Sequence, residues 1–184
     1  GGGLVALPTD SAYALTGRTG DADLLDRIRR IRGVDERHHF TLLCRDLSEI
    51  ATYARVDNVQ YRLLKATTPG PYTVILEGTK ELPRRMLHPK RKTIGLRVPE
   101  HAVVSALLAE LDAPLLSSTL LLPDEELPLT DPEDIRDRLG KQVDLVIEAG
   151  YCGPEATTVI DLTSGVPELV RLGRGDPAAF GLAA

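Results

Sequence analysis

Residues 115–122 read LLSSTLLL, an apolar run that only Ser117, Ser118 and Thr119 interrupt. A short, continuous apolar run of this kind is typical of a central strand that is covered on both faces. Hydroxyl groups inside such a strand need hydrogen-bond partners, so the serine pair indicates a polar site within the sheet. The run is much too short to cross a membrane, which takes about 20 apolar residues.

Strand patterns alternate with helix patterns on both sides of this run. Strands are predicted for residues 4–7, 40–44, 72–76, 93–98, 143–147, 158–162 and 169–172. Helices are predicted for residues 47–53, 59–66, 101–111 and 132–139, and for a segment around residues 24–31 that Asp21 or Asp23 can cap. This alternation predicts one α/β domain, and the close pairing of the last two strands across Ser164 and Gly165 predicts a mixed sheet.

The composition is that of one globular domain. The 184 residues are 42% hydrophobic and 27% charged, which excludes a disordered chain. No secretory signal precedes the first strand, so we expect a cytoplasmic protein with no membrane partner, and Cys44 and Cys152 as reduced, buried thiols. One disulfide remains arithmetically possible. The chain opens with Gly1, Gly2 and Gly3 and no methionine, which suggests that its natural N-terminus is missing.

The charge is unevenly distributed. The net charge is −5, yet residues 27–37 and 80–97 together hold 12 of the 22 basic residues and only three acidic ones, Asp35, Glu36 and Glu81. Basic segments in an acidic chain are typical of a protein that binds an anionic ligand at a defined place. The alternative is that the two basic segments form ordinary solvent-exposed surfaces that bind no ligand.

General catalytic motifs are missing from the sequence. It holds neither a P-loop nor an HExxH motif, and Gly173, Gly175 and Ala178 match GxGxxA with only six residues left after them, too few for a dinucleotide site. The four histidines do not share the spacing of metal ligands on a helix, so we expect no protein-bound metal. They are His38, His39, His88 and His101.

Hydroxyl residues stand at the ends of several predicted strands, where α/β proteins bind ligands. They are Thr9, Thr41, Thr73, Ser117, Ser118, Thr119, Thr157 and Thr158. For any single threonine, ordinary β-propensity is the alternative explanation.

Two arginines close the first helix. Arg30 and Arg32 point about 200° apart if the helix continues, and both can face one site only if it stops near Ile31. Guanidinium groups bind phosphate in a bidentate manner. The alternative is that they only complement the dipole at the helix C-terminus.

Taken in order, these segments resemble the YrdC family, and most closely its YciO branch. The resemblance rests on PTDSAYAL at residues 8–15, RIR at 30–32, PGPYT at 69–73, RVP at 97–99, SST at 117–119, TTVID at 157–161 and VRLG at 170–173. Residues 40–47, 80–99 and 142–145 carry the likeness to the YciO branch. The resemblance covers the whole chain and implies a single YrdC-like domain over residues 1–184. Its twisted mixed sheet would surround a concave basic cavity, and a preceding helix and strand would be missing here.

The resemblance also implies an activity, threonylcarbamoyl-adenylate synthesis for the tRNA modification threonylcarbamoyladenosine. L-threonine and bicarbonate would form a carbamate that attacks the α-phosphate of ATP, bound with Mg²⁺, and releases pyrophosphate. Such a reaction needs positioning and charge neutralisation more than covalent catalysis.

The family motifs imply roles for particular residues of this chain. The resemblance implies a catalytic role for Arg30, Arg32 and Arg97. It implies that the nucleotide is bound by Arg30, Arg32, Ser117, Thr119, Thr158 and Arg171. It implies that the amino acid is bound by Thr9, Tyr13 and Thr73.

Three positions depart from the family pattern. Arg30 replaces a lysine, Leu121 falls where the family has an asparagine, and Cys44 stands where active synthases have a histidine. We therefore expect a weak synthase or one with a shifted substrate.

The alternative is a module that binds double-stranded RNA or tRNA through Lys90, Arg91 and Lys92, without strong catalysis. A carbamoyl-transfer enzyme with another small acceptor is a third interpretation.

Overall fold

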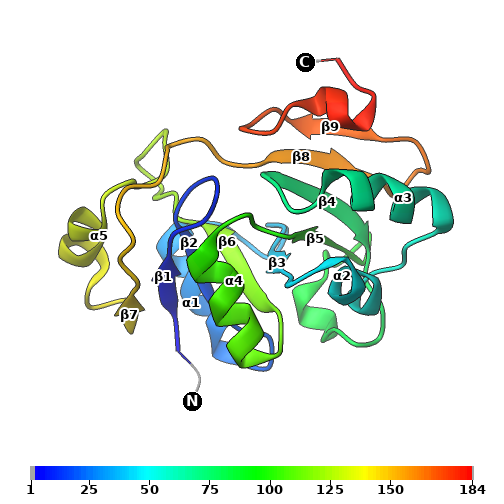
Figure 1. Ribbon diagram of the computed structural model, residues 1–184. Helices are drawn as coiled ribbons and strands as arrows, with labels where there is room; N and C mark the ends of the chain where they lie inside the picture. Colours follow the sequence, from blue (N-terminus) through cyan, green and yellow to red (C-terminus); the bar gives the residue numbers. More distant parts are fainter. Residues whose placement is uncertain (1–2, 184) are drawn as a thin grey trace.

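The computed structural model describes residues 3–183, which form one twisted sheet with helices on both faces (Figure 1). The strands are β1 (Val5–Leu7), β2 (Ala14–Arg18), β3 (Thr41–Leu43), β4 (Tyr72–Glu77), β5 (Thr93–Arg97), β6 (Leu115–Thr119), β7 (Leu145–Val146), β8 (Thr158–Asp161) and β9 (Glu168–Arg171). The α-helices are α1 (Ala22–Arg32), α2 (Leu47–Tyr53), α3 (Asn58–Thr67), α4 (Ala102–Leu111) and α5 (Pro132–Leu139), and two 3₁₀ turns span Arg84–Met86 (η1) and Pro177–Phe180 (η2).

The sheet is mixed, as predicted. Its strand order is β7-β1-β2-β6-β3-β5-β4-β8-β9, with parallel pairs β1–β7, β3–β5 and β4–β8 and the remaining pairs antiparallel. The predicted central strand β6 is confirmed: it lies between β2 and β3, with Ser118 opposite Leu15 and Leu116 opposite Leu42. The predicted pairing of the last two strands is confirmed as well.

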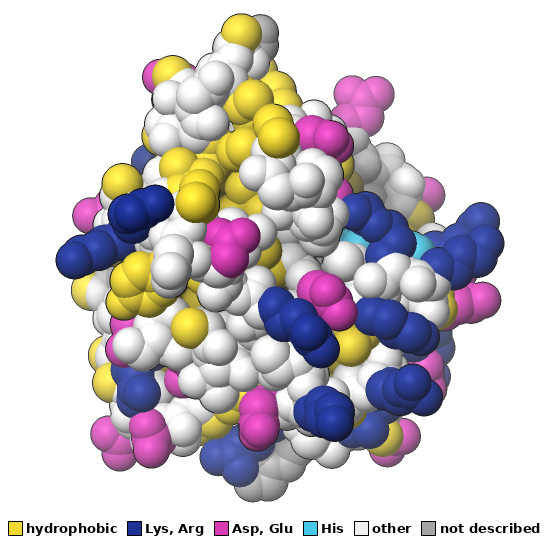
Figure 2. Space-filling model, turned by 90° about the vertical axis from the view of Figure 1, so that its right-hand side faces the viewer, with side chains coloured by type: hydrophobic (Ala, Val, Ile, Leu, Met, Phe, Trp, Pro, Cys, Tyr) yellow, Lys and Arg dark blue, Asp and Glu magenta, His cyan; other side chains and the backbone are white. Residues whose placement is uncertain are grey.

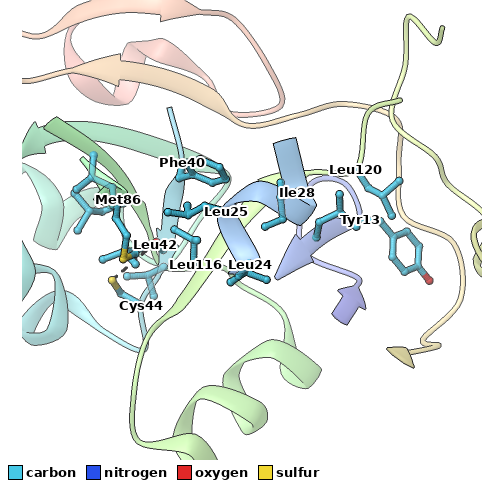
Figure 3. Close-up of a cluster of buried hydrophobic side chains, with 14 of the residues drawn as sticks. Tyr13, Leu24, Leu25, Ile28, Phe40, Leu42, Cys44, Met86, Leu116 and Leu120 are labelled. Carbon is cyan, nitrogen blue, oxygen red and sulfur yellow. Dashed lines mark hydrogen bonds between the residues drawn. The ribbon is translucent and has the colours of Figure 1, made fainter. Parts of the chain in front are cut away.

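Helices α1 and α4 cover opposite faces of the β1–β2–β6–β3 half of the sheet (Figure 1). Figure 3 shows Leu24, Leu25 and Ile28 of α1 gathered in one apolar cluster with Leu42 and Leu116 from the sheet. On the other face, α4 contributes Val104 and Leu108 to a smaller cluster. Because each face is covered by apolar side chains, the register of the central strands is fixed by burial.

Strand β2 was not predicted. Its five residues, ALTGR, lack a long apolar run, and the strand is stabilised by pairing with β1 on one side and β6 on the other. Gly17 is required at the point where α1 crosses, since a Cβ there would lie 2.6 Å from Leu24 Cδ1. Such a contact between distant segments leaves no periodic signal in the sequence.

The first helix begins at Asp21, one of its two predicted caps. The Asp21 carboxylate accepts the N–H of Asp23 at 3.0 Å as the N-cap, and Gly33 ends the helix with a φ of 67°. The helix is regular through Arg32, so Arg30 and Arg32 lie on different sides of it.

Both cysteines, Cys44 and Cys152, are buried and free. Within the described residues, no helix is both long and apolar enough to cross a membrane.

Candidate functional site

A cavity of about 670 Å³ is lined by residues from β2 to β6, β8 and β9. Most of the hydroxyl residues predicted at strand ends line it, although they come from three strands and one loop. These are Thr41, Thr73, Ser117, Ser118, Thr119 and Thr157. The volume is in the usual range for a small-molecule site.

Arg32 reaches the cavity from the last turn of α1. Its Nη1 donates to the Ser118 hydroxyl at 2.7 Å, and the same hydroxyl lies 2.9 Å from Nε2 of His38. Burial lowers the pKa of Arg32, and the nearby charge of Arg171 lowers it further. Two guanidinium groups close enough to repel each other would be stabilised by an anion placed between them.

Arg171, at the end of β9, is held by backbone and hydroxyl groups of the cavity wall. Its Nε and Nη2 donate to the Thr157 carbonyl oxygen at 3.1 and 2.8 Å, and the hydroxyls of Thr157 and Thr73 lie 2.7 Å apart. No carboxylate pairs with Arg171 among the described residues, and burial lowers its pKa. The positive charge is therefore available to a ligand.

Arg97 lines the same cavity, but its charge is already paired. Its Nη2 forms a buried ion pair with Asp10, and its Nη1 donates to the Ser11 hydroxyl at 3.1 Å. Burial lowers the pKa of Arg97, while the Asp10 carboxylate opposes that effect. Arg174 Nη1 donates to the Asp10 carbonyl oxygen at 2.7 Å, so this pair also ties the loop after β1 to the C-terminal segment.

The structure places three predicted site residues in the framework around the cavity. The Thr9 hydroxyl donates to the Ala12 carbonyl at 2.6 Å and does not line the cavity. The Thr158 hydroxyl, fully buried, donates to the Gly175 carbonyl at 2.5 Å, and it does not line the cavity either. Tyr13 does line it, but its hydroxyl donates to the Gly150 carbonyl at 2.6 Å.

Arg30 does not line the cavity, so the structure does not bring it beside Arg32 and its predicted role stays a prediction. Its side chain is exposed, and its Nε donates to the Asp26 carbonyl one turn earlier at 3.4 Å. The reason is geometric: α1 does not stop at Ile31, and residues two apart on a helix cannot face one ligand.

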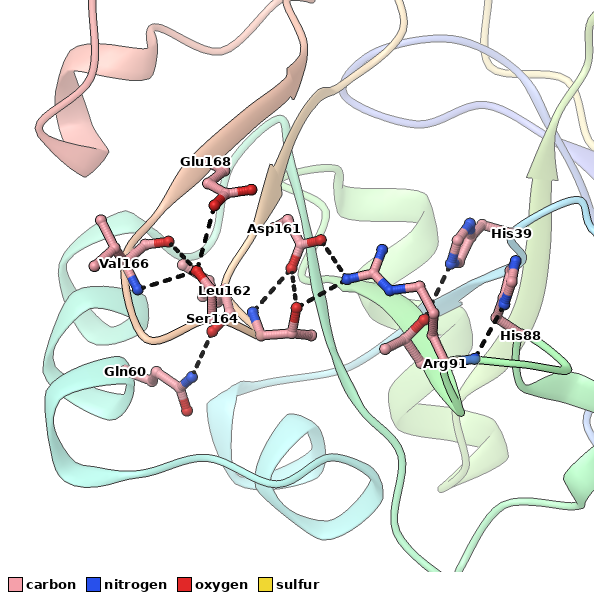
Figure 4. Close-up of polar contacts among 11 residues, drawn as sticks. His39, Gln60, His88, Arg91, Asp161, Leu162, Ser164, Val166 and Glu168 are labelled. Carbon is pink, nitrogen blue, oxygen red and sulfur yellow. Dashed lines mark hydrogen bonds and ion pairs between the residues drawn. The ribbon is translucent and has the colours of Figure 1, made fainter.

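The predicted RNA-binding residues Lys90, Arg91 and Lys92 are exposed on the loop between β4 and β5, away from the cavity lining. Arg91 Nη2 donates to Asp161 at 2.8 Å and to the Thr163 hydroxyl at 2.9 Å (Figure 4). Hydrogen bonding from Thr163 and Arg91 lowers the pKa of Asp161 against the opposing effect of its burial. Nη2 of Arg91 is therefore occupied by hydrogen bonds within the protein, and only the rest of its guanidinium is available to RNA.

Sequence reasoning missed two histidines that line the cavity. His39 Nε2 lies 3.1 Å from the Thr93 hydroxyl, and its ring stacks on that of His88 with centroids 4.7 Å apart (Figure 4). Burial lowers the pKa of His38 to about 4. The adjacent histidines are visible in the sequence, but only the fold brings His38 to Ser118.

The cavity lining combines three arginines with two glutamates, Glu126 and Glu155, so its predicted basic character stays a prediction. In residues 3–183, no three His, Cys, Asp or Glu side chains gather in a way that could hold a metal ion.

The chain is similar to proteins of known sequence over nearly its whole length. It is 55% identical to the uncharacterized protein YciO of Escherichia coli K12, over 97% of this chain and 87% of that protein. It is 31% identical to human threonylcarbamoyl-AMP synthase over 88% of this chain and 59% of that enzyme.

Solved structures agree with this similarity. The crystal structure of E. coli YciO matches with a TM-score of 0.94, covering 97% of this chain and 87% of that one. Sua5 of P. abyssi, solved with L-threonine, matches with a TM-score of 0.84 at 23% identity, over 93% of this chain and 50% of that one, and shows the shared fold. The model of the Sua5/YciO/YrdC family, described as telomere recombination, matches residues 1–173, and the chain belongs to this family.

Proposed function

We propose that the protein binds ATP with Mg²⁺ in this cavity and joins it to a carbamate of L-threonine, making threonylcarbamoyl-AMP. The observation that carries the proposal is the pair Arg32 and Arg171, a half-buried and an exposed arginine that line one cavity with no carboxylate partner among the described residues. The 31% identity to human threonylcarbamoyl-AMP synthase supports the same chemistry.

The reaction takes place in two steps. The amine of L-threonine attacks the carbon of bicarbonate, and loss of water leaves a carbamate. A carbamate oxygen then forms a bond to the α-phosphorus of ATP while the bond to the bridging oxygen of pyrophosphate breaks. The products are a mixed anhydride and pyrophosphate, so the protein must hold two anions together and stabilise negative charge on the phosphates.

The described side chains suit that task. Arg32 and Arg171 would bind phosphate oxygens, because guanidinium groups donate in pairs to such anions. The hydroxyls of Thr73, Ser117 and Thr119 line the cavity and would orient polar groups of the substrates. The Mg²⁺ would arrive with the nucleotide as part of the substrate.

Leu121, which stands where the family pattern has an asparagine, lines the cavity. An aliphatic side chain cannot hydrogen-bond to a substrate, which supports a slow reaction or a changed acceptor.

Calorimetric titration tests the proposal. Wild-type protein should bind ATP with Mg²⁺, and L-threonine with bicarbonate should tighten that binding. The Arg32→Ala variant should lose most of the nucleotide affinity while it keeps its thermal stability. Absence of nucleotide binding to the wild-type protein at millimolar concentrations would refute the proposal.

A second candidate, RNA binding, is favoured by the exposed basic side chains of the β4–β5 loop. These are Arg84, Arg85, Lys90, Arg91 and Lys92. Figure 2 shows lysine and arginine side chains gathered on one part of a face, interspersed with acidic ones. RNA affinity that falls steeply with salt concentration and is reduced by Lys90→Glu would support this function. An RNA affinity that neither salt nor Lys90→Glu changes would refute it.

A further inference from the structure

The Ser118 hydroxyl holds a central place in the cavity wall. It lies in the middle of the sheet on β6, only 5% exposed, and has two hydrogen-bond partners. Arg32 Nη1 lies at 2.7 Å and His38 Nε2 at 2.9 Å, and this oxygen has no third partner among the described residues.

The chemistry of the three groups favours one arrangement of the protons. A guanidinium can only donate, so the Ser118 oxygen accepts from Arg32. The remaining hydroxyl proton then has one acceptor within reach, Nε2 of His38. That acceptor exists only when the imidazole is neutral and carries its proton on Nδ1. With the imidazole proton on Nε2, the Ser118 oxygen would accept from both partners, and its own proton would have no acceptor among the described residues.

The surroundings of His38 favour the neutral ring. Burial is the main cause of its low pKa, and the positive charges of Arg32, His39 and Arg29 act in the same direction, while Asp35 opposes them. Its orientation is fixed by packing: the ring meets Phe40 edge-on, with centroids 5.2 Å apart. Phe40 is itself buried and lies 5.4 Å from the Arg29 guanidinium.

We propose that His38 and Ser118 are positioning residues, which hold the Arg32 guanidinium in place through a chain of hydrogen bonds. The chain uses Nη1 of Arg32 and leaves Nη2, which is not among the enclosed atoms, without a hydrogen-bond partner among the described residues. Nη2 would serve an anionic group of the ligand. The identity of this anion as a nucleotide phosphate rests on the proposed function, whereas the proton arrangement does not.

Nitrogen-15 NMR of the histidine rings tests the proton arrangement directly. In the uniformly labelled wild-type protein, the signals of His38 are identified by their loss in the His38→Gln variant. We expect the shift of an unprotonated Nε2 and a protonated Nδ1, unchanged between pH 8 and pH 5.5. In the Ser118→Ala variant, Nε2 should shift because its hydrogen-bond donor is gone. A proton on Nε2 in the wild-type protein would overturn the proposal.

Binding measurements test the positioning role. Ser118→Ala should weaken the binding of ATP with Mg²⁺, and of inorganic pyrophosphate, by about tenfold, or about 1.4 kcal/mol. Ser118→Thr keeps the hydroxyl and should restore most of the affinity. Thr16→Val is the matched control, since it removes a buried strand hydroxyl that bonds to the Val5 carbonyl outside the cavity. Its affinity should equal that of the wild-type protein.

The outcomes separate this inference from the proposed function. If the wild-type protein binds the nucleotide and Ser118→Ala binds it equally well, the positioning role is wrong and the proposed function stands. If the wild-type protein binds neither ATP nor pyrophosphate, the proposed function and the positioning of Arg32 for such an anion are wrong, and the NMR measurement alone decides the proton arrangement. Binding lost equally in Ser118→Ala and Ser118→Thr would show a packing effect and would also overturn the positioning role.

Discussion

The buried ion pair between Asp10 and Arg97 gives the clearest stability prediction. The two side chains are 9% and 8% exposed, and Asp10 is the one carboxylate that contacts Arg97 among the described residues. Changing Asp10→Asn leaves the guanidinium charge buried and unpaired. The second carboxylate oxygen of Asp10 accepts the Glu100 N–H at 2.8 Å, so an amide oxygen that keeps this bond turns its NH₂ group toward Arg97. The substitution therefore removes both the charge and the acceptor that faces the guanidinium.

Removing one member of a buried ion pair costs about 3–5 kcal/mol of unfolding free energy. For a chain of this length, each kcal/mol shifts the melting temperature by about 2–4 °C, so Asp10→Asn should melt roughly 6–20 °C below the wild-type protein. Urea unfolding followed by circular dichroism measures the free energy, and a thermal scan measures the shift.

The matched control is Asp112→Asn. Asp112 pairs with Arg45 at 2.7 Å, but its side chain is 80% exposed, and asparagine tolerates its φ of 49°. An exposed pair contributes about 0–1 kcal/mol, so the control should stay close to the wild-type protein. If Asp10→Asn costs no more than Asp112→Asn, the account of Arg97 as a charge stabilised mainly by Asp10 is wrong.

Three further predictions follow from the site and the core. Arg32→Ala should abolish the thermal stabilisation of the protein by ATP with Mg²⁺, whereas Arg30→Ala should keep it; equal effects in a thermal-shift assay would contradict the geometry of α1. The pKa of His38 is lowered to about 4 in the folded protein, so its stabilising effect is complete above about pH 6.5 and is lost as the pH falls toward 4, by up to about 3 kcal/mol. Urea unfolding between pH 7 and 4.5 should show that slope reduced in His38→Gln, and an unchanged slope would refute the assignment. Burial raises the pKa values of Cys44 and Cys152, so a thiol reagent should label both quickly only after denaturation, and rapid labelling of the folded protein would show that they are accessible.

Much of the fold could be predicted because burial leaves periodic patterns. The run at residues 115–122 predicted the central strand, which ends at Thr119, and Asp131 and Pro132 marked the start of α5. The exceptions are segments whose structure depends on their neighbours. Strand β2 forms because β1 and β6 lie on either side. Strand β7 is limited to Leu145–Val146 because, among the described residues, it pairs with β1 alone.

The cavity could be predicted only in part, for a similar reason. Thr73 near the start of β4 and Ser117 inside the apolar run of β6 were predicted correctly at the cavity. Side-chain direction could not be predicted for Thr9 or Thr158, whose hydroxyls bond to nearby backbone carbonyls instead of facing the cavity. His38 had no signal of its own, because its partner Ser118 lies 80 residues away in the sequence.

Product analysis by mass spectrometry tests the central claim most directly. Wild-type protein and the Arg32→Ala variant are incubated with L-threonine, bicarbonate, ATP and Mg²⁺, and the mixtures are searched for threonylcarbamoyl-AMP and pyrophosphate. We expect both products from the wild-type protein and neither from the variant. No threonylcarbamoyl-AMP from a wild-type protein that still binds ATP would contradict the assignment of L-threonine as the acceptor and leave a nucleotide site that serves another reaction.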